Sequence, residues 1–132
     1  MGTTALDPDE LVTEVEVPVP AAATTQSYRK FRVRNSIDFP IVSVASVLSL
    51  HEDRVRQARV VLGAVAPVPV RAVDVERFLV GRRPSPVSAE AAGTIALRSA
   101  CPLPHNEFKA QIVRALLREA VLEVGDGLDD GA

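Results

Sequence analysis

The sequence predicts an α+β domain in which a sheet of three to four antiparallel strands packs on about three helices. In the first half of the chain apolar residues alternate with polar ones or form β-branched runs; in the second half they recur at helical spacing. The chain has 132 residues, 47% of them hydrophobic and 24% charged, which suffices for one core. Its apolar runs fall far short of a membrane span, and its single cysteine favours a reducing compartment. We therefore expect a cytoplasmic protein with no membrane contact.

The first 26 residues are predicted to form a strand followed by a linker. Residues 11–17, LVTEVEV, alternate between apolar and polar and stop at Pro18, as a half-buried strand would. Such a strand needs a partner. Residues 18–26 are small and proline-bearing, with no periodicity, and are typical of a linker.

The next segment, residues 28–34 with the sequence YRKFRVR, is predicted to be a strand with one cationic side. Alternation places Tyr28, Lys30, Arg32 and Arg34 on that side, and Arg29, Phe31 and Val33 on the other. After Asn35, the position of Pro40 suits the first turn of a short helix.

A β-hairpin follows, with a crossover behind it. Residues 41–50 are a β-branched run, residues 54–63 alternate, and the short polar segment 51–53 joins them. Beyond Gly63, Pro67 and Pro69 remove two ladder donors, so this stretch cannot continue as a central strand.

Three helices complete the domain, which we expect to extend over residues 27–124. The first is predicted over residues 73–80, where Asp74 and Glu76 are N-terminal charges and Gly81 is the stop. The second opens at Ser85 and Pro86 and runs through Arg98. The third follows Asn106 and runs through Glu123. Residues 125–132, acidic and glycine-rich, are expected to be disordered.

The charge is unevenly distributed. All 15 basic residues lie between Arg29 and Arg118, where only seven of the 17 acidic residues are found. Such a basic body with acidic ends is suited to an anionic ligand or an acidic partner surface, although solubility alone would also explain it. Tyr28 and Phe31 among basic residues leave weak single-strand nucleic-acid binding as a third hypothesis, which the 4% aromatic content does not favour.

Catalytic and metal-binding signatures are missing from the sequence. His51, His105 and Cys101 are the only histidines and cysteine, and no two share a helix face at ligand spacing. No glycine-rich phosphate loop, dinucleotide fingerprint or nucleophile elbow is present. We expect no catalytic activity from this chain alone and no metal site.

Four stretches, taken in order, resemble the FAD-binding medium subunit of molybdenum hydroxylases, the family of aerobic carbon monoxide dehydrogenase and xanthine dehydrogenase. They are ALDPDELVTEVEVP (residues 5–18), YRKFRVRNSIDFPIVSVASVL (28–48), ARVVLGAVAPVPVRAVDVERFLVGR (58–82) and PLPHNEFKAQIVRALLREAV (102–121). The similarity is to the last strand of the FAD domain, placed within residues 1–26, and then to the whole C-terminal domain.

The resemblance implies a domain that covers the flavin and docks subunits, and so supports electron transfer from iron–sulfur clusters through FAD. The implied partners are the FAD-binding N-terminal domain, the iron–sulfur subunit and the molybdopterin subunit. Residues 30–38 match the loop over the flavin, which makes Lys30, Arg32, Arg34 and Asn35 the candidate cofactor-binding residues, with Tyr28 and Phe31 as packing. Cations beside the flavin would stabilise its anionic reduced form.

The sequence departs from this family in one respect. The glycine-rich phosphate-binding motifs belong to the part upstream of Ala5, so the FAD would be shared with that absent domain and not held tightly by this chain alone. The alternative is a stand-alone interaction domain that retains the fold without flavin. An exposed edge at residues 11–17 would then favour a partner or self-association.

Overall fold

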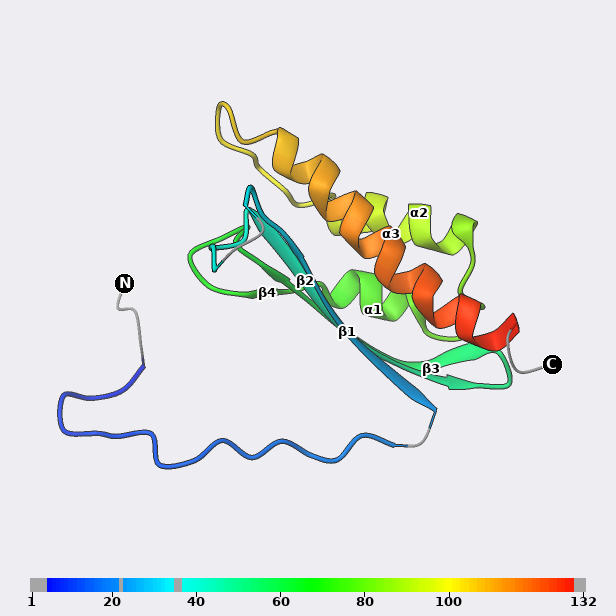
Figure 1. The fold of residues 1–132 in the computed structure, drawn as a ribbon, viewed down its shortest axis with the longest axis horizontal. Helices are drawn as coiled ribbons and strands as arrows, with labels where there is room; N and C mark the ends of the chain where they lie inside the picture. Colours follow the sequence, from blue (N-terminus) through cyan, green and yellow to red (C-terminus); the bar gives the residue numbers. More distant parts are fainter. Residues whose placement is uncertain (1–4, 22, 35–36, 130–132) are drawn as a thin grey trace.

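One antiparallel sheet carries three helices on a single face, which confirms the predicted α+β class (Figure 1). The computed structural model describes residues 5–21, 23–34 and 37–129. The strands, hydrogen-bonded in the order β1-β2-β3-β4, are β1 (Thr24–Phe31), β2 (Val42–His51), β3 (Arg54–Gly63) and β4 (Val70–Arg71). The helices are α1 (Val73–Leu79), α2 (Pro86–Ala96) and α3 (Phe108–Asp129).

The predicted hairpin forms the centre of the sheet. β2 pairs with β3 along almost its whole length, and alternate side chains of both strands point to the helices. Val44 and Leu48 of β2 and Val60 of β3 are fully buried there. The strand at residues 70–71 is an edge strand only, which agrees with the prolines that precede it.

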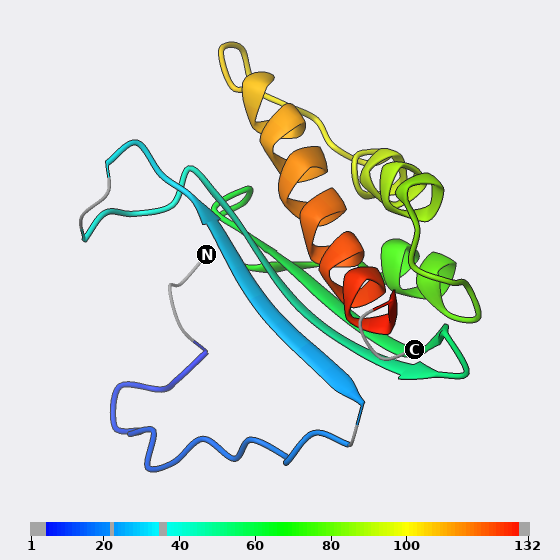
Figure 2. The same cartoon turned by 45° about the vertical axis from the view of Figure 1, so that its right-hand side comes forward.

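The helices close the core from one side (Figure 2). α3 contributes a stripe that includes Val113, Leu117 and Val121, each 2% exposed or less. On α2 the small residues Ala89 and Ala92 are fully buried, as the small-residue pattern predicted. Ser85 caps α2, because its side chain accepts from the Ser88 backbone N–H while the Ser88 hydroxyl accepts from the Ser85 backbone N–H.

Residues 11–17 form no strand in this structure, although the sequence predicts one there. These residues run outside the helix–sheet sandwich, with exposed side chains and no ladder partner among the described residues (Figure 1). Alternation encodes a half-buried strand only where another strand lies beside it, and no residue that the structure describes pairs with this segment. β1 begins at Thr24, inside the predicted linker, because Thr24–Gln26 already pair with Val47–Ser49 of β2.

Two further boundaries differ from the prediction. No helix forms at Pro40: residues 38–40 are irregular, and the chain enters β2 directly at Val42. α3 continues to Asp129, so residues 125–129 of the predicted disordered tail are helical. Val124 is 3% exposed and packs in the core, and this contact stabilises the helix beyond Glu123.

Candidate functional site

The sheet face opposite the helices carries polar side chains together with Tyr28, Val47 and Val61. Arg29 fixes which side of β1 faces the helices, because its guanidinium donates to Glu119 (3.1 Å) and Glu123 (2.9 Å) of α3. Tyr28 and Lys30 therefore point to the open face and share one side of the strand, as alternation predicted. β1 ends at Phe31, however. Arg32 and Arg34 therefore do not lie on the strand in line with Lys30, contrary to the prediction.

Lys30 lies at the end of β1 where the neighbouring positions of the open face carry only small side chains. It pairs with Ser43 of β2, and Ser43 pairs with Gly63 of β3. A Cβ atom at position 63 would meet the Ser43 hydroxyl, so glycine lets Ser43 lie over the β3 backbone. The segment before β1 borders a groove over the other end of this face, together with Thr24 and Gln26, and Lys30 is not among the residues that line it.

The segment between β1 and β2 forms a closed loop at this end of the sheet. The Ile41 backbone N–H donates to the Phe31 carbonyl (2.9 Å) and so joins the two ends. Asp38 organises the interior of the loop: it accepts from Arg34 Nε (3.2 Å) and from the Phe39 backbone N–H (3.0 Å). This loop, residues 32–40, is called the β1–β2 loop below.

The β1–β2 loop exposes apolar side chains next to its cations. Val33 is 77% exposed, Phe39 90% and Ile37 fully. Isolated exposed apolar residues are normal, but three on one loop, beside its cations, indicate a contact surface. Sequence analysis missed Ile37 and Phe39, because apolar residues amid turn residues carry no periodicity that distinguishes a core contact from an exposed one.

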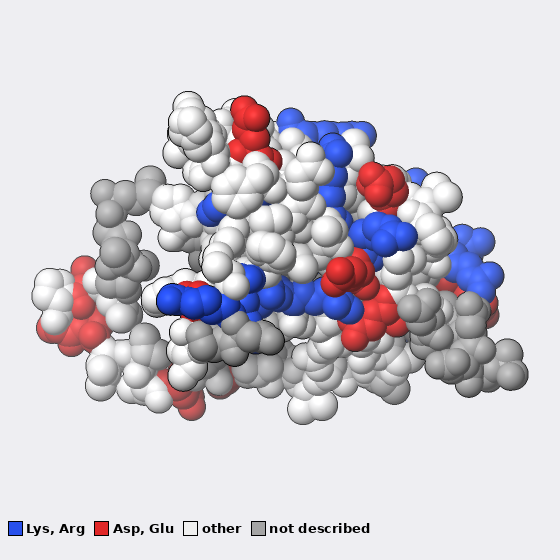
Figure 3. Space-filling model, turned by 45° about the horizontal axis from the view of Figure 1, so that its top comes forward, with Lys and Arg blue, Asp and Glu red and all other residues white. Residues whose placement is uncertain are grey.

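The predicted cofactor-binding residues thus fall at one end of the sheet, in two kinds of structure. Lys30 is held by the β1–β2 ladder, whereas Arg32 and Arg34 lie on the loop, and Asn35 lies outside the described residues. Tyr28 is 64% exposed and Phe31 45%, on opposite faces of β1. Figure 3 shows a band of basic side chains across one side of the molecule that meets acidic side chains.

Other chemistry is sparse in the part of the chain that the structure describes. No three His, Cys, Asp or Glu side chains gather there as a metal site would require. None of the described helices combines the length and apolarity needed to cross a membrane. Asp74 faces Arg77 at 3.6 Å on the exposed side of α1, whereas Glu76 is buried.

Comparison with known proteins gives one family and several relatives. The family model for the CO dehydrogenase flavoprotein C-terminal domain matches residues 26–124. The nicotine 6-hydroxylase medium subunit of Paenarthrobacter nicotinovorans is 31% identical over 126 residues, which cover 92% of this chain and 44% of that protein. The aldehyde oxidoreductase FAD-binding subunit of Escherichia coli is 32% identical over 120 residues, covering 91% and 34%.

Solved structures share the fold. A Cu,Mo-CO dehydrogenase chain superimposes with a TM-score of 0.75 at 24% identity, over 83% of this chain and 40% of that one. Quinoline 2-oxidoreductase from Pseudomonas putida 86 gives a TM-score of 0.72 at 23% identity, over 84% and 39%. The chain spans less than half the length of each of these relatives.

Proposed function

Since the chain belongs to the family of CO dehydrogenase flavoprotein C-terminal domains, we propose that it covers the flavin and docks subunits in the FAD subunit of a molybdenum hydroxylase. In this role it supports electron transfer from iron–sulfur clusters through FAD, and its own contribution is the environment of the cofactor. The two curated relatives described above are, by name, a medium subunit of a hydroxylase and an FAD-binding subunit of an oxidoreductase.

The observation that carries this proposal is the β1–β2 loop, which joins exposed apolar side chains to cations. An isoalloxazine ring is planar and apolar on its faces, and gains negative charge at one edge when it is reduced. Ile37 and Phe39 supply exposed apolar surface, and Lys30, Arg32, Arg34 and Asn35 are the groups proposed to lie near the charged edge. A loop with this composition fits a cover over the ring.

The residues present do not fit the other half of FAD. Diphosphates are bound by glycine-rich backbone and helix N-termini, and the sequence contains no such motif. We therefore propose that the FAD is shared with another domain, which supplies the diphosphate site. Residues 11–17, extended and exposed in this structure, are proposed to pair with a strand of that domain.

A tagged form of the protein, purified from its source cell, tests this function. We expect iron–sulfur and molybdopterin subunits to copurify in fixed stoichiometry, with flavin and iron–sulfur absorption bands. Identification by mass spectrometry and the absorption spectrum are both needed, because each could fail separately. Recovery of the chain alone and colourless contradicts the proposal and favours the stand-alone interaction domain.

A further inference from the structure

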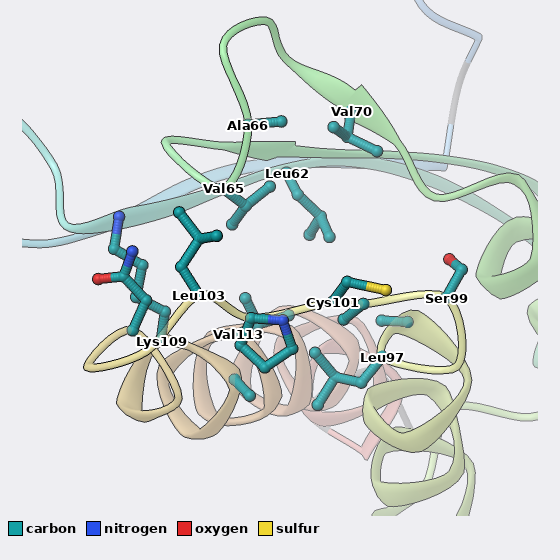
Figure 4. A pocket seen from close by; sticks show the side chains of 15 residues that line it. Leu62, Val65, Ala66, Val70, Leu97, Ser99, Cys101, Leu103, Lys109 and Val113 are labelled. Carbon is teal, nitrogen blue, oxygen red and sulfur yellow. The ribbon is translucent and has the colours of Figure 1, made fainter.

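A cavity of about 340 Å³ lies on the helix side of the sheet, opposite the Lys30 face, between two irregular loops (Figure 4). One loop follows β3 and the other joins α2 to α3. Its walls are mainly aliphatic, from Leu62, Val65 and Val70 on the sheet side and Leu97, Leu103 and Val113 on the helix side. Apolar cavities of about half this volume already bind benzene, so this one has room for a chain or ring system of about ten non-hydrogen atoms.

The polar side chains of the cavity are Ser99, Asn106 and Lys109; all three can donate hydrogen bonds, and Lys109 is the only one that carries a charge. Lys109, on the first turn of α3, donates one hydrogen bond from Nζ to the Ala64 carbonyl (3.0 Å). An ammonium has three donors, so two remain for a ligand. Asn106 lines the same cavity, and its amide supplies further donors. Such a lining favours a ligand with an acceptor or a negative charge at one end.

The backbone at the rim is held in unusual conformations. Ala64 has φ of 61° and His105 has φ of 69°, a region that residues other than glycine rarely adopt. One lies in each of the two loops that border the cavity, and the Lys109 hydrogen bond fastens the first to α3.

We propose that this cavity is a binding site for a small monocarboxylate with an apolar body, its carboxylate toward Lys109 and Asn106. The cavity does not include the β1–β2 loop, so the test of this site does not depend on the proposed function. Cys101, the only cysteine of the chain, lines the cavity and is exposed, and it therefore reports occupancy without any role in binding.

The test measures the rate at which N-ethylmaleimide alkylates Cys101 in the full chain, followed by intact-mass spectrometry. Octanoate is expected to slow alkylation saturably, at least threefold, whereas butyrate, with too short a chain, does not at equal concentration. Lys109→Met is expected to raise the half-protecting octanoate concentration about tenfold, the effect of losing one charge-assisted hydrogen bond. 1-Octanol, which has no charge, should protect this variant and the unaltered protein equally, which also shows that the variant is folded.

Two control variants distinguish binding in the cavity from a general effect of octanoate on the protein. Arg118→Met removes an exposed cation from the same helix and should leave octanoate protection unchanged. Ala100→Phe places a ring at the cavity wall and should abolish protection by both probes. Absence of saturable protection by octanoate, or equal protection in Ala100→Phe, overturns the site. An unaltered octanoate response in Lys109→Met overturns the assignment of the carboxylate.

Discussion

Replacement of Glu76 by glutamine is expected to lower the free energy of unfolding by about 2 to 3 kcal/mol. Glu76 is 5% exposed on α1 and ties three parts of the fold together. Oε1 accepts from the Val60 backbone N–H and from Arg71 Nε, both at 2.9 Å, and Oε2 accepts from Arg71 Nη2 at 2.7 Å. A glutamine keeps the volume but turns a donor toward Arg71, so the bidentate pair is lost.

The expected loss is below that of a fully buried ion pair because the Arg71 side chain is 50% exposed and regains water. Urea unfolding followed by circular dichroism measures it. Glu90→Gln, which alters an exposed glutamate of α2, is the matched control and should change stability by less than about 0.5 kcal/mol. Equal unfolding midpoints for the two variants would show that Glu76 does not anchor the fold.

The same carboxylate makes stability depend on acidity. Burial alone would raise the pKa of Glu76, but the hydrogen bonds from Arg71 and Val60 and the charges of Arg71 and Arg59 outweigh it and hold the pKa below its ordinary value. Since the unfolded chain then binds the proton more tightly, this stabilisation is present above the unfolded pKa of about 4.3 and lost as the pH falls through the folded pKa. The difference in stability between the unaltered protein and Glu76→Gln should therefore shrink on acidification; a difference constant down to pH 3 would contradict this.

The second large effect is expected from the exposed tip of the β1–β2 loop. In the complete complex, the double substitution Ile37→Ser with Phe39→Ser should weaken FAD binding by about 2 kcal/mol, roughly 30-fold. The reason is that both side chains are exposed in this chain, and under the proposed function they become buried against the flavin and its domain. Flavin release during dialysis, followed by fluorescence, measures the change.

Because both side chains are already exposed, the double variant should leave the stability of the chain itself unchanged. Val87→Ser is the matched control: Val87 is an apolar side chain of α2 that is 81% exposed and is separate from the β1–β2 loop. Retention of flavin equal to that of the control would mean that the loop tip does not cover the cofactor.

Much of the fold could be predicted where one pattern extends over ten or more residues. The hairpin β2–β3 and the helix α3 have such patterns, because a buried face repeats in each. Residues 11–17 have an equally regular pattern, but alternation encodes only the strand and not its partner. Pro40 matched a helix start locally, yet the β-branched run after it pairs in the sheet and decides the conformation.

The candidate site was harder to predict than the fold. Alternation alone placed Lys30 on the same side of the strand as Tyr28, whereas the contacts of Arg29 with α3 show that this side is the open face. Glu76 was interpreted as a helix N-terminal charge, because sequence cannot show that Arg71, five residues earlier, turns back onto it at the sheet edge. The exposure of Ile37 and Phe39 depends on how the loop leaves the sheet, which no local pattern encodes.

Lys30 and the β1–β2 loop are proposed to lie over the flavin, and the flavin reduction potential in the intact complex tests this placement most directly. Lys30→Met should make the two-electron potential more negative by about 30 to 60 mV, because one charge-assisted contact to the reduced ring is lost. Lys30→Arg should restore most of it, and Arg56→Met, on β3, should have no effect. A potential unchanged in Lys30→Met would contradict the account.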